Sequence, residues 1–206
     1  MAINDNKIYL ASKSPRRREL LRQIGVEFEL LLLRDSPNRG PDVSEEVLPD
    51  ESPDTYVARV TQEKAGVAWQ IMTMRKLPLR PVLAADTTVV INNKILGKPQ
   101  DQAEALSMLR QLSGATHTVL TSIAVHHMDG NLHAMQRSEV TFANLTDAQM
   151  QAYCLSQEPY DKAGGYGIQG SAARFISHIS GSYSGIMGLP LFETSQLLRK
   201  AGIFIP

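Results

Sequence analysis

Three consecutive arginines stand near the start of the chain, where a helix is expected to begin. The run Ser14-Pro15-Arg16-Arg17-Arg18 offers a serine for the N-cap and a proline for the first helical position. Arg16 and Arg17 then fall in the first turn, where the helix dipole disfavours cations unless an anion is present. Serine hydroxyls, backbone N–H groups and guanidinium groups together predict a phosphate site. The alternative is a solvated basic helix start.

This conflict at the helix start has a consequence for stability. A first-turn cation without its anion is unfavourable by a few tenths of a kcal/mol. The sequence therefore predicts that Arg17→Ala weakens binding of the phosphate ligand but leaves the ligand-free protein as stable as before, or more stable.

One carboxylate interrupts the most strand-like run of the sequence. Residues 81–91 are mostly Val, Ile, Ala, Leu and Thr, and Asp86 stands in their middle. Asp is depleted in strands, and an ionised carboxylate among apolar residues is costly unless it is paired, hydrogen-bonded or bound to a metal. Asp86 is therefore the strongest single candidate for chemistry. The alternative is a strand-end or bulge position that faces water.

Two lysines occupy positions that the surrounding elements would fix. Lys64 stands on the apolar side of a helix expected from Pro53 to about Met74. That side is formed by Tyr56, Val60, Val67 and Ile71. The Lys64 stem could instead snorkel with its amine at the rim, which is the commoner arrangement. Lys98 lies in the turn Gly97-Lys98-Pro99, directly before a helix capped by Asp101.

A glycine-rich segment follows the fourth expected helix. Residues 158–170 have the sequence EPYDKAGGYGIQG, which is too rich in glycine for a helix or an ordinary strand. The glycines would let the backbone approach a ligand closely, with the Tyr166 ring and the Gln169 amide available for recognition. The segment matches neither the Rossmann fingerprint GxGxxG nor the P-loop pattern GxxxxGK[ST].

The remaining pattern predicts an α/β fold with a mixed, twisted sheet. Arg34 to Asp54 is expected to be a long loop, either disordered or functional, that carries Glu45 and Glu46. The segments 175–179 and 183–187, on either side of a Ser180-Gly181 turn, are expected to complete the sheet. Further strands are expected at 8–10, 26–33, 81–91, 94–96, 116–126 and 132–142, and helices at 15–24, 53–74, 101–113, 146–156 and 190–200.

Composition limits the class of protein. The 206 residues are 43% hydrophobic, which is enough for a single domain over residues 1–206. Such a chain could form one compact unit or two small lobes around a cleft. Lys plus Arg and Asp plus Glu each total 21, so neither nucleic acid nor a membrane surface is expected as a partner. The single Cys154, the polar N-terminus and the lack of a long apolar run predict a cytoplasmic protein. The five histidines lack metal-site spacing and are expected to be structural or surface residues.

The motifs SKSPRRREL, EKA, AADTTVV, GKPQD and DKAGGYGIQG resemble those of the Maf family of nucleoside triphosphate pyrophosphatases, over Leu10 to Leu198. This resemblance implies an α/β fold related to inosine triphosphatase, with two lobes around a cleft, in a homodimer. It also implies cleavage between the α- and β-phosphates of a nucleoside triphosphate, which yields the monophosphate and pyrophosphate. A divalent cation, Mg²⁺ or Mn²⁺, would assist the reaction.

The same resemblance implies roles for individual residues. Asp86 would be the catalytic acid or base and would share a metal with Glu45. The residues that would hold phosphates, metal and water are Ser12, Arg17, Glu45, Lys64 and Lys98. The specificity positions of the subgroup that acts on dTTP and UTP would be Arg16, Thr87 and Gln169.

One segment departs from the family pattern. About ten extra residues, Leu32 to Pro41, precede Asp42-Val43-Ser44-Glu45, where the family usually runs directly from the second strand into a motif like Asp-Ile-Asp-Glu. Aligning Glu45 with the family acid keeps Glu51-Ser52-Pro53 in register. Glu46 stays open as an alternative, and the role of the extra residues is open as well.

Other function classes compete with a dTTP and UTP pyrophosphatase. A regulatory protein could use the same pocket to sense a nucleotide and affect septum formation and cell division, as the family name suggests. A phosphoryl transferase is disfavoured because P-loop and kinase motifs are missing. The intact Asp86 favours catalysis. The sequence leaves open the preferred metal, the dimer interface and the choice among canonical and modified pyrimidine nucleotides.

Overall fold

A computed structural model describes residues 5–36 and 40–206, and in this part of the chain a seven-stranded mixed sheet forms the framework. Its order is β2-β1-β5-β7-β8-β9, with β6 pairing to β5. β1 is parallel to β2 and β5, and the other pairs are antiparallel. The strands are β1 (Lys7–Leu10), β2 (Glu27–Leu30), β5 (Val82–Ile91), β6 (Lys94–Leu96), β7 (Thr116–His127), β8 (Gly130–Phe142) and β9 (Ile176–Ser180).

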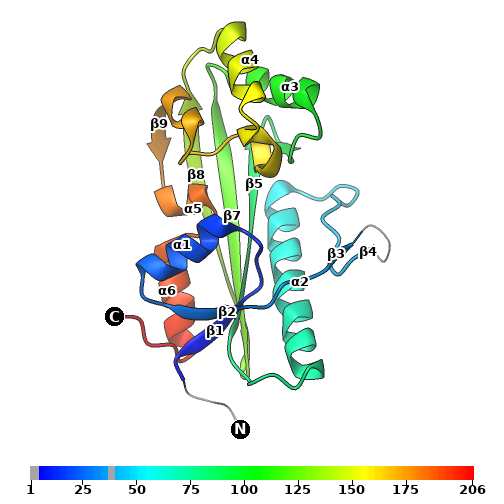
Figure 1. The fold of residues 1–206 in the computed structure, drawn as a ribbon, viewed down its shortest axis with the longest axis vertical. Coiled ribbons are helices and arrows are strands. Elements are labelled where there is room, and N and C mark those ends of the chain that lie inside the picture. Colours follow the sequence, from blue (N-terminus) through cyan, green and yellow to red (C-terminus); the bar gives the residue numbers. More distant parts are fainter. Residues whose placement is uncertain (1–4, 37–39) are drawn as a thin grey trace.

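The helices cover both faces of the sheet, and most begin at caps that the sequence predicts. The hydroxyl or carboxylate of Ser14, Ser52, Asp101 and Thr146 accepts a backbone N–H of the first turn. α2 lies along one face of β5 and β7, while α1, α5 and α6 lie on the opposite side (Figure 1). The helices are α1 (Pro15–Gln23), α2 (Pro53–Met74), α3 (Gln102–Leu112), α4 (Asp147–Leu155), α5 (Tyr183–Met187) and α6 (Leu191–Lys200).

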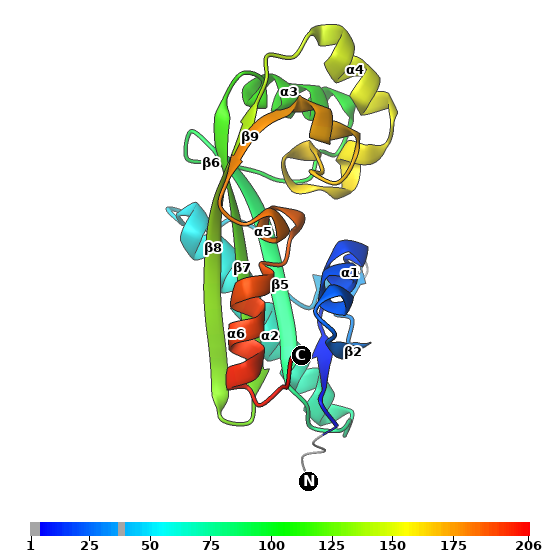
Figure 2. The same ribbon diagram turned by 90° about the vertical axis from the view of Figure 1, so that its left-hand side faces the viewer.

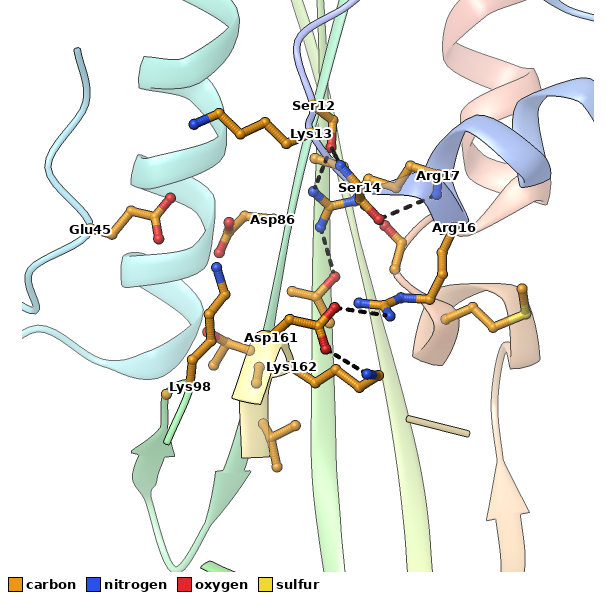
Figure 3. A pocket seen from close by; sticks show the side chains of 18 of the residues that line it. Ser12, Lys13, Ser14, Arg16, Arg17, Glu45, Asp86, Lys98, Asp161 and Lys162 are labelled. Atoms are coloured by element: carbon orange, nitrogen blue, oxygen red, sulfur yellow. Dashed lines mark hydrogen bonds and ion pairs between the residues drawn. The ribbon is translucent and has the colours of Figure 1, made fainter. Parts of the chain in front are cut away.

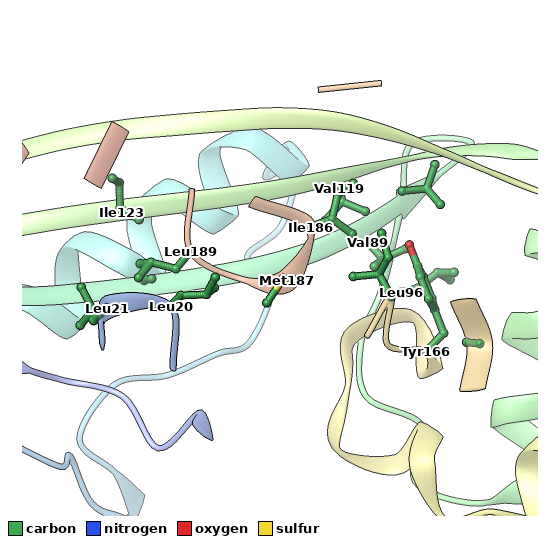
Figure 4. Close-up of a cluster of buried hydrophobic side chains, with 14 of the residues drawn as sticks. Leu20, Leu21, Val89, Leu96, Val119, Ile123, Tyr166, Ile186, Met187 and Leu189 are labelled. Atoms are coloured by element: carbon green, nitrogen blue, oxygen red, sulfur yellow. The ribbon is translucent and has the colours of Figure 1, made fainter. Parts of the chain in front are cut away.

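Two lobes share the long central strands. Figure 2 shows α3, α4 and the 3-10 turns of residues 158–175 at one end, facing α1 and β2. A continuous buried cluster joins the lobes, with Leu20 and Leu21 of α1, Met187 of α5 and Tyr166 of the glycine-rich segment all buried (Figure 4). Burial of this apolar surface is the main stabilising contribution, and it fixes both lobes around β5. The predicted α/β fold with a mixed sheet and two lobes is confirmed.

Two local predictions were wrong. Residues 183–187 form the short helix α5 instead of a strand, because the Ser182 hydroxyl caps it through the Gly185 N–H at 3.0 Å. Five residues are too few for periodicity to distinguish the two. On α2, Val67 and Ile71 are only half-buried. The side that faces the sheet is completed by Val57, Ala65, Ala68 and Met72.

The long segment between β2 and α2 has little regular structure. Within it, β3 (Asp35–Ser36) pairs with β4 (Gly40–Pro41) in an antiparallel arrangement. This pair falls in the extra residues Leu32 to Pro41, of which 37–39 lie outside the described residues. Among the helices that the structure describes, none is long and apolar enough to cross a bilayer.

Candidate functional site

A cavity of about 690 Å³ lies between the lobes (Figure 3). It is lined by the start of α1, the segment after β2, the middle of β5, the turn after β6 and the glycine-rich segment. The structure brings together in its wall all nine residues that the resemblance singled out. These are Ser12, Arg16, Arg17, Glu45, Lys64, Asp86, Thr87, Lys98 and Gln169.

An ammonium group bridges two carboxylates on one wall. Lys64 Nζ of α2 lies 2.7 Å from Asp86 Oδ1 and 2.6 Å from Glu45 Oε1. Burial works against the charge of Lys64, but the Asp86 and Glu45 carboxylates outweigh it and raise the pKa of the ammonium. Lys64 therefore does not extend its amine to bulk water, and its side chain is 15% exposed.

Asp86 occupies a regular position inside the sheet. It stands opposite Ser122 of β7 in an unbroken antiparallel register, so the bulge or strand-end alternative is wrong. Its carboxylate faces the cavity, where Figure 3 shows the Lys98 side chain extended toward the same place. Glu45 also lines the cavity, whereas Glu46 is exposed and is absent from the lining. The geometry thus places Glu45, and not Glu46, beside Asp86.

These two carboxylates fit a hard divalent cation. Carboxylate oxygens are the ligands that Mg²⁺ and Mn²⁺ prefer. Residues 5–36 and 40–206 contain no cluster of three or more His, Cys, Asp or Glu that could enclose a metal. A cation at Glu45 and Asp86 would therefore complete its coordination with water or phosphate oxygens, as is common for Mg²⁺.

Arg17 is held by three acceptors from distant parts of the chain. Its Nε donates to Gly188 O at 2.7 Å, Nη1 to Ser12 Oγ at 3.2 Å and Nη2 to Thr87 Oγ1 at 3.1 Å. Burial lowers the pKa of the guanidinium, and the carboxylates of Asp86 and Glu45 oppose this shift. Hydrogen bonds therefore hold the Arg17 side chain in place, although none of the three acceptors carries a charge, and the unfavourable first-turn cation stays a prediction. Its side chain has partners even without an anion.

Thr87 is placed by the same contacts. Its Oγ1 accepts from Arg17 Nη2 at 3.1 Å and lies 3.1 Å from Thr121 Oγ1. Thr121 donates its single hydroxyl hydrogen to Gly185 O at 2.8 Å, because a carbonyl oxygen can only accept. The Thr87 hydroxyl therefore donates to Thr121 Oγ1, and these contacts fix Thr87 at the cavity wall.

Sequence reasoning missed Asp161 and Lys162 on the facing wall. Asp161 Oδ2 lies 3.7 Å from Arg16 Nη1, and Oδ1 lies 2.5 Å from Lys162 Nζ. Asp161 thus links a cation of α1 to a cation of the other lobe (Figure 3). The sequence held a signal for them, because an acid and a base stand just before Ala163 and the glycines at 164 and 165. Lys13 and Tyr56 also line the cavity and were not singled out.

Close approach of neighbouring side chains explains two of the glycines. A Cβ on Gly167 would stand 2.7 Å from Lys162 Cε, and one on Gly170 would stand 2.0 Å from Glu158 Oε1. The Glu158 carboxylate also accepts the Ser171 N–H at 2.9 Å. These contacts fix the segment that carries Gln169 at the cavity.

The cavity concentrates positive charge in a chain whose net charge is zero. Three carboxylates line it, those of Glu45, Asp86 and Asp161. Seven cationic side chains line it as well, those of Lys13, Arg16, Arg17, Arg34, Lys64, Lys98 and Lys162. Such an excess in a concave, partly desolvated space attracts polyanions. Leu32, Leu33, Arg34 and Pro41 of the extra residues contribute to the same lining.

A family model and the curated relatives point to one family. Residues 7–201 match the family model described as Maf-like protein. A dTTP/UTP pyrophosphatase of Dechloromonas aromatica is 50% identical over 95% of this chain and 98% of its own length. The proteins of that name from Ralstonia nicotianae and Nitrosospira multiformis are 55% and 52% identical, over 95% and 100% of this chain and 94% and 99% of theirs. The solved Staphylococcus aureus Ham1 protein aligns at a TM-score of 0.36 and 13% identity, over 67% of this chain and 72% of that one. The match to the family model and these near full-length relatives show that the chain belongs to the Maf-like protein family.

Proposed function

We propose that this protein is a nucleoside triphosphate pyrophosphatase that hydrolyses dTTP and UTP to the nucleoside monophosphate and pyrophosphate. The observation that carries the proposal is the pair of carboxylates at Lys64, set in a cavity whose other walls are cationic. Relatives with 50% to 55% identity bear the name dTTP/UTP pyrophosphatase, which supports the choice of substrate.

The triphosphate would lie between the two lobes. Arg16 of α1, Lys98 of the turn after β6 and Lys162 of the other lobe all line this space. A triphosphate carries several negative charges, and guanidinium and ammonium groups in a partly desolvated cavity bind it strongly. When the α–β bond breaks, charge grows on the leaving pyrophosphate, so the same cations stabilise the transition state more than the ground state.

Asp86 would act as the general base. Its Oδ1 is held by Lys64, which fixes the carboxylate on the sheet, and Oδ2 can accept a proton from water. The water oxygen forms the new bond to phosphorus while the α–β bridging bond breaks and pyrophosphate leaves. Lys64 keeps the Asp86 and Glu45 carboxylates together although they carry like charges.

Glu45 and Asp86 would hold a divalent cation, Mg²⁺ or Mn²⁺, which when bound supplies charge neutralisation at the phosphates. The residues fit this role because both are hard oxygen donors that line one wall of the cavity. Lys64 would then orient the two carboxylates from the side of α2.

Base selection would depend on groups that can reach the edge of the base. Gln169 is exposed at the cavity, and its amide offers a donor and an acceptor to the alternating edge of thymine or uracil. Thr87 and Arg16 line the same cavity and are the other two candidates. Purines, which present a different edge, would leave such groups unsatisfied, at about 1–3 kcal/mol each.

The test is a nucleotide panel with purified protein and Mg²⁺ or Mn²⁺. We expect kcat/KM for dTTP and UTP to exceed that for CTP, ATP and GTP by roughly tenfold to a hundredfold. Gln169→Ala should reduce this preference, whereas His178→Ala, on exposed β9, should not. Nucleotide binding without release of pyrophosphate would refute the enzyme and favour a nucleotide sensor. A kcat/KM for GTP equal to that for dTTP would refute the proposed substrate specificity but leave the pyrophosphatase activity standing.

Two further expectations belong to the same proposal, one from the family resemblance and one from the composition. The protein would act as a homodimer and in the cytoplasm. Light scattering of the purified protein tests the first, and fractionation of the cells that produce it tests the second.

A further inference from the structure

The segment that carries Glu45 needs support from outside itself. It runs from Val43 to Ser52 without regular secondary structure, and the Glu45 side chain is 52% exposed. Even so, its carboxylate stands 2.6 Å from Lys64 Nζ. A functional side chain on irregular backbone keeps its place only if neighbouring groups fix that backbone.

Two side chains of α2 hold this backbone directly. Tyr56 OH donates to Glu45 O at 3.0 Å, and Arg59 Nη2 donates to Glu46 O at 2.9 Å. Arg59 and Lys64 stand three and eight residues after Tyr56, on either side of it around the helix. Together the three side chains hold the backbone of residues 45 and 46 and the Glu45 carboxylate. The Arg59 guanidinium also lies over the Tyr56 ring, 5.8 Å from its centroid.

Glu51 in turn fixes Arg59 through a bidentate ion pair. Arg59 Nε lies 2.7 Å from Glu51 Oε1, and Nη2 lies 2.9 Å from Oε2. The Glu51 side chain is 4% exposed, and hydrogen bonds from Arg59 hold the pKa of its carboxyl below the usual range. Glu51 also closes the end of the segment, because Leu48 N–H donates to Oε2 at 3.1 Å and Glu51 N–H donates to Leu48 O at 3.1 Å.

We propose that Arg59 and Glu51 form a positioning pair that holds residues 45–48 against α2 and thereby sets the Glu45 carboxylate beside Asp86. The role of Glu45 in this inference rests on the proposed function. Neither Arg59 nor Glu51 lines the cavity, so both act through the backbone that they hold. A guanidinium suits the task because its planar fork binds both carboxylate oxygens and one nitrogen still reaches Glu46 O.

The first test needs neither metal nor substrate. Amide hydrogen exchange of residues 43–51 is compared among wild type, Arg59→Ala, Arg59→Lys and the control Arg110→Ala, which removes an exposed pair with Asp147. We expect exchange at Leu48 and Glu51 to rise by about tenfold in both Arg59 variants and to stay unchanged in the control. Unchanged exchange in Arg59→Ala would overturn the proposal. If Arg59→Ala does not fold, the nearly isosteric variant Glu51→Gln takes its place. Unchanged exchange in that variant would overturn the proposal in the same way.

The second test asks whether the pair acts through Glu45. In Arg59→Ala, we expect the Mn²⁺ concentration for half-maximal dTTP hydrolysis to rise by roughly tenfold to a hundredfold, with a smaller change in KM for dTTP. In a Glu45→Gln background the same substitution should have little further effect. If Arg59→Ala raises the half-maximal Mn²⁺ concentration as much in the Glu45→Gln background as in the wild type, the proposal is overturned. If the wild type hydrolyses no nucleotide, the proposed function fails, and hydrogen exchange still decides whether the pair positions the segment.

Discussion

Arg17→Ala is the substitution for which the structure changes the expected outcome most. The variant loses three hydrogen bonds, which join α1 to Gly188 after α5, to Ser12 after β1 and to Thr87 on β5. Two of these span 171 and 70 residues of sequence, so they connect α1 to parts of the fold that are distant along the chain. The ligand-free protein should therefore be less stable without Arg17.

The size of this loss follows from the acceptors. A hydrogen bond from a charged donor contributes about 1.5–3 kcal/mol when its partner would otherwise stay buried and unsatisfied. Here the cavity admits water to the three acceptors, and removing a buried guanidinium relieves its desolvation, so most of that sum is offset. We expect a net loss of about 1–3 kcal/mol. For a 206-residue protein this corresponds to about 2–7 °C in Tm.

The assay is thermal and urea unfolding of the ligand-free protein. The matched control is Arg18→Ala in the same helical turn, whose half-buried side chain bonds locally, donating to Lys13 O at 2.9 Å and to Ser14 O at 3.4 Å. The control should stay within about 0.5 kcal/mol of the wild type. An Arg17→Ala protein with an unchanged or higher Tm would refute the structural argument and support the uncompensated cation that the helix dipole predicts.

Three other predictions concern charged and titratable groups. Glu45→Gln should lower kcat/KM for dTTP by roughly tenfold to a hundredfold, while Glu46→Gln stays near wild type; equal losses would contradict the placement of Glu45 alone in the cavity. Asp161→Asn should lower the Ki for pyrophosphate by about threefold, since it removes an anion between two cations, and a raised Ki would contradict this. Burial lowers the pKa of His117 from 6.5 to about 4, so the unfolded chain binds a proton that the folded chain does not. Stability should therefore fall as the pH falls through this window, by about 2 kcal/mol between pH 7.5 and 5. His117→Gln should lack this component in urea unfolding, and an identical pH dependence in both proteins would contradict it.

Local chemistry made most of the fold predictable. Caps such as Ser52 and Asp101 act on N–H groups within three residues, so the starts of α2 and α3 could be predicted from a few neighbours. Asn92 and Asn93 adopt positive φ values of 49° and 60°, as a tight hairpin turn requires. Residues 183–187 were assigned incorrectly because their helix depends on the Ser182 cap and on packing against β7.

The site was predictable only in part, for a related reason. Asp86 stood out because a carboxylate in an apolar strand conflicts with its surroundings, and Lys64 because it interrupts an apolar side. Their pairing depends on how α2 crosses β5, which no local pattern encodes. No local pattern revealed the hydrogen-bond partners of Arg17 either, because two of them lie 171 and 70 residues away in the sequence.

Glu45 was found through the family resemblance, since an acid in a long loop carries no local signal of its own. The close approach of the Lys162 and Glu158 side chains to Gly167 and Gly170 became visible only in the folded chain.

The central claim is that Asp86 acts as the base in a hydrolysis that divides a triphosphate between its α- and β-phosphates. It is tested most directly by quantifying the products of dTTP with Mg²⁺ under single-turnover conditions, for wild type and Asp86→Asn. We predict equimolar dTMP and pyrophosphate, with the variant folded but slower by roughly 100- to 10,000-fold. Formation of dTDP and phosphate, or near-normal turnover by Asp86→Asn, would contradict the account.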